Sequence, residues 1–262
     1  MGSSKMAMLA PMWALMTLWL TLVAVAGVLA YQKWQKTTGA IRAQLLYLWM
    51  GATIVFVGDL LHTIAFTVST YTDNPTGPVT ILGSVFEFRT FAMFFDALVF
   101  MVYYALWALF IVSRYQHGRR ESYDKVSLGL AVTAMVLILP GVVPNALGIY
   151  TLEYDIAIWS PHIILFIVFG VMTVWKLIRC SRYAFKQASD PVTQTQERAL
   201  SIAGIGFAFS FLFFTLFLML TTLNSEPGIF MILKTFAYMI ALFYLIKGFI
   251  LSQREHTTAT DS

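Results

Sequence analysis

The chain has 262 residues, of which 59% are hydrophobic, 16% aromatic and only 11% charged. Soluble domains contain roughly 45–50% apolar and about 25% charged residues, so this composition excludes an ordinary water-soluble domain and predicts an integral membrane protein. The net charge of +4 comes from basic residues in separate connections, which argues against nucleic-acid binding. The lone Cys180 excludes an internal disulfide and a cysteine-based zinc cage.

Seven apolar stretches, each long enough to cross a bilayer, follow one another along the chain. Polar residues, prolines and glycines separate them, as expected for turns between spans. We therefore predict one all-α domain, a bundle of seven transmembrane helices over 1–252, and a disordered cytoplasmic tail over 253–262. The predicted helices cover 6–31, 43–70, 80–113, 126–145, 160–179, 199–223 and 228–251.

Lysine and arginine alternate between the two sides of this predicted bundle. The connections after the second, fourth and sixth spans carry none, whereas those after the first, third and fifth are basic. By the positive-inside rule, the N-terminus lies outside and the C-terminus is cytoplasmic, which suits a plasma membrane protein. The basic residues in question are Lys33, Lys36, Arg42, Arg114, Arg119, Arg120, Lys125, Lys176, Arg179, Arg182, Lys186 and Arg198.

The second span contains the sequence Gly58-Asp59-Leu60-Leu61-His62. Residues three apart lie on the same face of a helix, so the Asp59 carboxylate and the His62 imidazole are neighbours. Ionisable groups within a membrane are costly, and they usually face a bundle interior, a watery cavity or a partner charge. The two residues therefore mark a polar interior in this bundle.

Other spans carry ionisable residues at a similar depth. In the predicted orientation Arg89, Asp96, His162 and Lys234 all fall in the outer half, which predicts an outward-facing polar pocket among the second, third, fifth and seventh helices. Arg89 and Asp96 are seven apart and share a helix face. We predict that Asp59, His62, Arg89, Asp96 and Lys234 bind a small ligand, an ion or a proton. Apart from the lipid bilayer, other membrane subunits are the expected partners.

Two alternatives use the same residues differently. In the first, Asp59, His62 and His162, joined by Glu87 or Asp96, hold a divalent metal such as zinc. Such a metal could activate water for a membrane-embedded hydrolase. In the second, Asp59 pairs with a cation of another helix and the role is structural. A bound metal with an open coordination position would separate these readings.

Two functional families share only general features with this chain. Microbial rhodopsins also have seven helices with a lysine in the last one, but their lysine lies near the middle of that helix, whereas Lys234 lies near one end. A retinal protein is therefore disfavoured. Hydrolases of the ceramidase and adiponectin-receptor superfamily are similar in size, helix count and a histidine in the second helix. Their H-x-x-x-H pair in the seventh helix has no counterpart in 228–251.

A closer resemblance is carried by Gly58-Asp59-x-x-His62, followed in the third span by Tyr103-Tyr104-x-x-Trp107. This pattern resembles a family of uncharacterised bacterial seven-helix membrane proteins with G-D-x-x-H in the second helix. Those proteins continue with L-x-P-R, whereas Thr63-Ile64-Ala65-Phe66 follows here. The resemblance implies no known activity. It makes Asp59 and His62 better candidates for the site.

Overall fold

The computed structural model describes the backbone of residues 3–71, 79–81, 84–86, 88–116, 122–146, 156–222 and 228–252. It describes the side chains within 13–64, 94–116, 122–143, 159–216, 229–230 and 232–252. The predicted tail over 253–262 and the Glu87 side chain lie outside the described residues.

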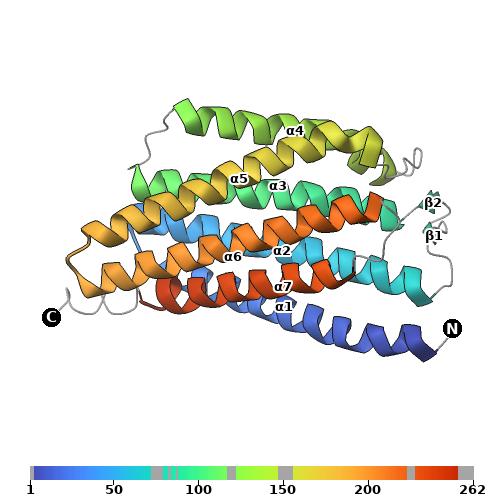
Figure 1. Ribbon diagram of the computed structural model, residues 1–262, viewed down its shortest axis with the longest axis horizontal. Coiled ribbons are helices and arrows are strands. Elements are labelled where there is room, and N and C mark those ends of the chain that lie inside the picture. The colour runs from blue at the N-terminus through green and yellow to red at the C-terminus, as the bar shows by residue number, and fades with distance from the viewer. Residues whose placement is uncertain are drawn as a thin grey trace.

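Seven long helices form a bundle in which successive helices pack side by side (Figure 1). The chain passes from α1 to α7 around the bundle, and contacts between α1 and α7 close the ring. α3 also contacts α5, so it lies toward the centre. The helices are α1 Ser3–Lys36, α2 Gly39–Tyr71, α3 Phe88–Tyr115, α4 Ser122–Ala146, α5 Ile156–Gln187, α6 Pro191–Thr222 and α7 Gly228–Tyr244, which the π-helical segment Leu245–Ile250 continues.

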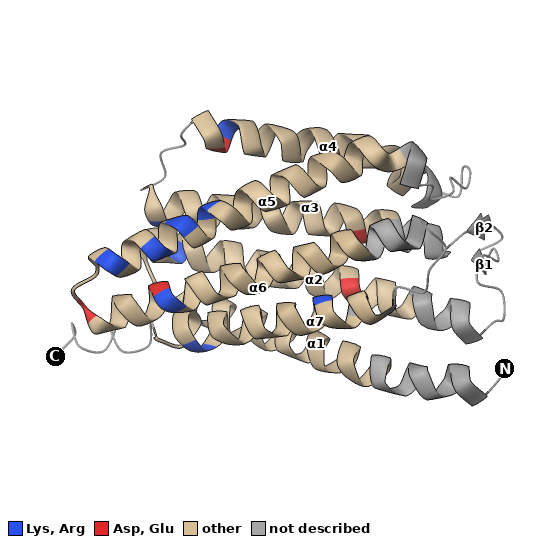
Figure 2. Ribbon diagram, in the orientation of Figure 1, with Lys and Arg blue, Asp and Glu red and all other residues tan. Residues whose placement is uncertain are grey.

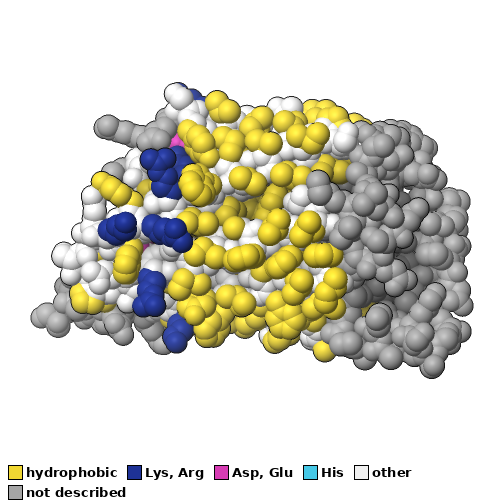
Figure 3. Space-filling model, viewed as in Figure 1, with side chains coloured by type: hydrophobic (Ala, Val, Ile, Leu, Met, Phe, Trp, Pro, Cys, Tyr) yellow, Lys and Arg dark blue, Asp and Glu magenta, His cyan; other side chains and the backbone are white. Residues whose placement is uncertain are grey.

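All seven helices are long and apolar enough to cross a membrane. Large apolar side chains remain exposed around the middle of the bundle, among them Val132, Phe209 and Ile240, each more than half exposed. Figure 3 shows hydrophobic side chains covering the middle of one face of the bundle. A soluble monomer does not expose such a continuous apolar surface, whereas a bilayer covers it. The prediction of a seven-helix membrane bundle is confirmed, and the chain is an integral membrane protein.

Basic residues gather at one end of the bundle, called the basic end here (Figures 2 and 3). It is formed by the last turns of α1, α3 and α5 and the first turns of α2, α4 and α6. Short connections join the helices here. Thr37 and Thr38 link α1 to α2, and Gly39, the first residue of α2, adopts a φ of 68°, which side-chain-bearing residues rarely accept. The members of the basic end are Lys33, Lys36, Arg42, Arg114, Lys125, Lys176, Arg179, Arg182, Lys186 and Arg198.

The third helix begins later than predicted. Val79–Ile81 and Ser84–Phe86 form strands β1 and β2, which pair antiparallel with Val79 opposite Phe86. α3 then begins at Phe88, so the prediction of a helix from residue 80 is wrong at its start. The physical reason is strand propensity, because these two segments are rich in Val, Ile, Thr and Phe.

Several helices also continue further at the basic end than their apolar residues require. α1 ends at Lys36, α5 ends at Gln187 and α6 begins at Pro191. α6 has an N-cap, since the Asp190 carboxylate accepts a hydrogen bond from the backbone N–H of Thr193 at 2.8 Å. Polar residues can thus continue a helix beyond the apolar layer when a cap satisfies its first amides.

The last turn of the seventh span is π-helical. The backbone N–H of Leu251 donates to the carbonyl of Ile246 at 2.9 Å, five residues back. Gly248 lies against α6 here, and a Cβ at this position would stand 2.1 Å from the Cβ of Ala199. The absence of a side chain therefore allows the widened turn to pack closely on α6.

Candidate functional site

Four of the predicted site residues meet in one small cavity. α2 supplies Asp59 and His62, α3 supplies Asp96, and α7 supplies Lys234. The cavity measures ≈ 30 Å³, which is room for about two water molecules. Figure 2 shows charged positions on α2 and α7 that lie well away from the basic end. The other side chains around the cavity are Met16, Trp19, Phe100, Thr235 and Tyr238.

Asp59 is held by a tryptophan of the first helix. Its side chain is buried, and its Oδ2 accepts a hydrogen bond from Trp19 Nε1 at 2.6 Å. The Trp19 ring also packs against Tyr238, with ring centroids 5.4 Å apart. A hydrogen bond to a buried carboxylate is stronger than one between neutral groups. Trp19 therefore fixes Asp59 from α1 without neutralising its charge.

The glycine that precedes Asp59 brings α2 and α3 together. A Cβ on Gly58 would lie 2.8 Å from a methyl carbon of Val99, a distance that real Cβ atoms do not adopt. Glycine at this position lets the two helix backbones approach, as small residues do in membrane bundles. The approach carries Asp59 and His62 toward Asp96, which is three residues before Val99.

His62 and Asp96 face one another across the α2–α3 contact. His62 Nδ1 lies 3.6 Å from Asp96 Oδ2, which is an ion-pair distance but too long for a good hydrogen bond. Within the described part of the chain, neither His62 Nδ1 nor Asp96 Oδ1 has a hydrogen-bond partner. Buried polar atoms without a partner are unfavourable, so a proton, water or ion between them would be stabilised here.

Lys234 completes the cluster from α7. It is only 8% exposed, and its ammonium lies 4.8 Å from the ring centroids of both Phe100 and Phe214. Cation–π contacts of this kind stabilise a desolvated ammonium. Asp59, His62, Asp96 and Lys234 line the same small cavity, so the charge on each of these four side chains acts on the others.

The charge of this group is unbalanced when His62 is neutral. With both carboxylates ionised as well, Asp59 and Asp96 would place two negative charges beside the single ammonium of Lys234. An uncompensated charge buried in a membrane is unfavourable by several kcal/mol, to order of magnitude. One added positive charge, such as a proton on His62, would bring the group to neutrality.

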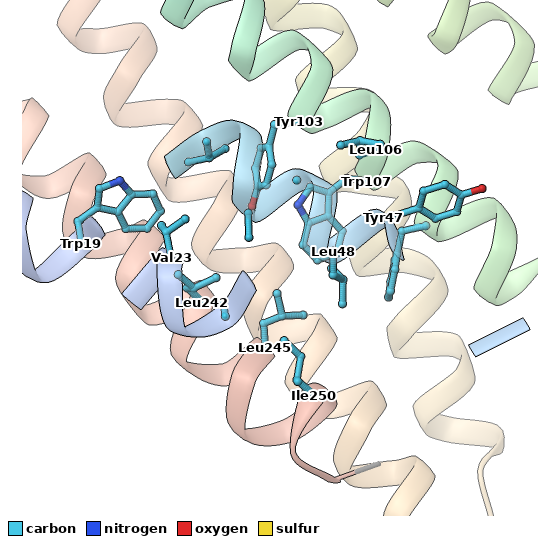
Figure 4. Close-up of a pocket in the computed structure, with 15 residues that line it drawn as sticks. Trp19, Val23, Tyr47, Leu48, Tyr103, Leu106, Trp107, Leu242, Leu245 and Ile250 are labelled. Carbon is cyan, nitrogen blue, oxygen red and sulfur yellow. The ribbon is translucent and has the colours of Figure 1, made fainter. Parts of the chain in front are cut away.

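An apolar layer separates the charged cavity from the basic end. Tyr238, beside the cavity, shares a hydroxyl hydrogen bond with Tyr104 of α3 at 2.9 Å. Beyond this pair lies a second gap of ≈ 20 Å³ among α1, α2, α3 and α7, lined almost wholly by apolar side chains. In Figure 4 these apolar side chains, which include Val23, Leu48 and Leu242, lie between Trp19 and Tyr47.

The structure separates His162 from the other predicted metal ligands. His162 Nδ1 lies 3.0 Å from the carbonyl of Ala134, on the α4–α5 contact, and does not line the cavity. No group of three or more His, Cys, Asp or Glu with a metal-binding arrangement occurs among the described residues. The arrangement of donors thus gives the zinc hypothesis no support. For Arg89 only the backbone in the first turn of α3 is described.

Sequence reasoning missed a second buried polar network, at the basic end. Arg114 was expected in a loop, but its guanidinium lies inside the bundle and donates to Glu197 at 2.6 and 2.9 Å. Gln44 and Gln196 accept further hydrogen bonds from Arg114, and Tyr115 donates to Glu197. This network joins α2, α3 and α6. On the neighbouring helices Lys176 of α5 pairs with Asp124 of α4.

No known protein family, curated protein or solved structure matches this chain.

Proposed function

We propose that this integral membrane protein binds one exchangeable proton in the cluster of Asp59, His62, Asp96 and Lys234. The observation that carries the proposal is the facing pair His62 Nδ1 and Asp96 Oδ2, 3.6 Å apart beside a cavity, in a group with two carboxylates and one ammonium. The cavity of ≈ 30 Å³ admits water or a small ion, whereas pockets for drug-sized ligands typically measure about 300–1,000 Å³.

The position of the cluster suggests access from one side of the membrane. Asp59 and His62 come late in the span Gly39–Ile64, and Asp96 and Lys234 come early in theirs, so all four lie toward the end opposite the basic one. The apolar layer between the cavity and the basic end would hinder proton passage. Under the positive-inside rule the basic end faces the cytoplasm, and the cluster exchanges its proton with the outer side. In this proposal the cluster acts as a proton-binding switch or as one half of a proton relay across the membrane.

Nitrogen-15 NMR of histidine-labelled protein in lipid bilayers tests the proposal. The chain has four histidines, so individual signals can be assigned with His62→Gln. We expect His62 to be an imidazolium in the wild type at neutral or mildly acidic pH. In Asp96→Asn it should become neutral at the same pH, because Asp59 and Lys234 then balance one another.

His162 provides an internal control in the same spectra, since it is buried but does not line the cavity. Its signal should be the same in the wild type and in Asp96→Asn. A His62 signal that is neutral at all accessible pH values, or one that Asp96→Asn leaves unchanged, would contradict the proposal. If sodium ions in place of N-methylglucamine abolish the imidazolium signal, the site takes a metal cation instead of a proton.

A further inference from the structure

The exposed face of α5 at the basic end forms a groove of ≈ 280 Å³. The residues that line it recur three or four positions apart along the helix, so all of them lie on one face. Three cationic side chains, two aromatic ones and one isoleucine form the lining. The lining residues are Trp175, Ile178, Arg179, Arg182, Tyr183 and Lys186.

Among the described residues, no carboxylate pairs with the three cations of this groove. Arg179, Arg182 and Lys186 are exposed, and within the described part of the chain no ion pair involves them. Two other basic residues at this end differ, because Arg114 pairs with Glu197 and Lys176 with Asp124. The groove therefore concentrates positive charge that is available to an anion from outside the bundle.

An apolar track leads away from these cations along the same helix. Ile164, Val168, Val171 and Trp175 are 59%, 42%, 55% and 64% exposed. Their spacing of four, three and four residues places them in one stripe. From residue 164 to residue 175 a helix rises about 16 Å, which is comparable with the length of a lipid acyl chain. Figure 3 shows the basic side chains at the edge of the apolar surface.

We propose that this face of α5 binds an anionic phospholipid. Arg179, Arg182 and Lys186 hold the phosphate of the headgroup, because guanidinium groups bind phosphate oxygens in pairs and lysine adds a point charge. Trp175 and Tyr183 lie at the level of the membrane interface, where amphipathic aromatic rings are favoured. One acyl chain follows the stripe from Trp175 to Ile164. The apolar track favours a lipid over a free phosphate ion, which would need the cations alone.

Native mass spectrometry of the full chain, released from nanodiscs with mixed phosphatidylglycerol and phosphatidylcholine, tests this assignment. We expect the wild type to retain phosphatidylglycerol in preference to phosphatidylcholine. The variant Arg179→Gln/Arg182→Gln/Lys186→Gln should lose this preference by roughly tenfold or more, since each of the three basic residues contributes to the attraction of an anionic headgroup.

The matched control Lys36→Gln/Lys125→Gln/Arg198→Gln removes three exposed charges from the same end of the bundle but from α1, α4 and α6. It should retain phosphatidylglycerol as the wild type does, and both variants should unfold at the wild-type temperature. The proposal is overturned if the wild type shows no preference, or if the control loses as much as the groove variant. Displacement of the lipid by millimolar inorganic phosphate would assign the groove to a free anion instead.

Discussion

The hydrogen bond from Trp19 to Asp59 gives the sharpest test of how the cluster is held. Trp19→Phe removes the indole N–H, which donates to Asp59 Oδ2 at 2.6 Å, but keeps an aromatic ring beside Tyr238. Hydrogen bonds to charged groups contribute about 1.5–3 kcal/mol, and a buried carboxylate that loses its donor incurs the full desolvation penalty. We therefore expect the free energy of unfolding to fall by about 2–3 kcal/mol more than ring truncation alone would cause.

Trp34→Phe is the matched control, because it deletes the same atoms elsewhere on α1. The Trp34 ring stacks on Trp49 with centroids 5.8 Å apart, and no hydrogen bond to its indole N–H is found among the described residues. The assay is unfolding by SDS titration in mixed micelles, monitored by circular dichroism. Equal losses in the two variants would refute the reasoning.

A double-mutant cycle isolates the interaction itself. In an Asp59→Asn background the carboxylate charge is absent, so Trp19→Phe should be less costly by about 1–2 kcal/mol. Strictly additive effects of the two substitutions would show that Trp19 stabilises the bundle through packing and not through Asp59.

Two further predictions concern other parts of the bundle. Glu197→Leu should lower the free energy of unfolding by about 3–5 kcal/mol, because it leaves the buried Arg114 unpaired. The double variant Arg114→Leu/Glu197→Leu should recover part of this lost stability. A double variant that is no more stable than Glu197→Leu in an SDS titration would contradict this prediction. Gly58→Ala should be less stable than the wild type by about 1–3 kcal/mol, because its methyl group would clash with Val99. Adding Val99→Ala to this variant should relieve the clash and restore stability. A Gly58→Ala variant as stable as the wild type would show that α2 and α3 separate easily.

Much of the fold could be predicted because the bilayer imposes simple requirements. Seven apolar runs of spanning length and the alternation of basic connections lead directly to the seven-helix bundle that the structure shows. The helix ends were harder to predict. Asp190-Pro191 lies between the predicted spans 160–179 and 199–223, although an N-cap carboxylate before a proline is a signal for a helix start. Apolar residues show which part of a helix lies within the membrane, whereas capping residues determine where the helix begins.

The candidate site could be predicted in part, for a similar reason. Asp59, His62, Asp96 and Lys234 stand out as ionisable residues in apolar spans, and the structure brings them together. Trp19 carried no such signal, because a tryptophan in an apolar helix is equally suited to packing or to an interface. Only the three-dimensional structure shows that its indole N–H donates a hydrogen bond to Asp59.

Arg114 and Glu197 were missed because sequence hydropathy places them at the edges of spans. Their side chains are only 12% and 3% exposed, since the helices continue past the apolar layer and enclose them. His162, by contrast, was predicted to belong to the site but lies elsewhere. Its position in an outer turn suggested the cavity, but α5 directs it toward the Ala134 carbonyl of α4. Depth in the membrane can be predicted from sequence, whereas the direction of a side chain around its helix depends on packing.

The most direct test of the central claim is the number of protons taken up per protein in liposomes when the pH is stepped from alkaline to mildly acidic values. The wild type and Met16→Leu, a volume-conserving change in the cavity wall, should take up the same number. Asp96→Asn should take up one proton fewer, because loss of a carboxylate removes the reason for the imidazole to charge. Equal uptake by the wild type and Asp96→Asn would contradict the account.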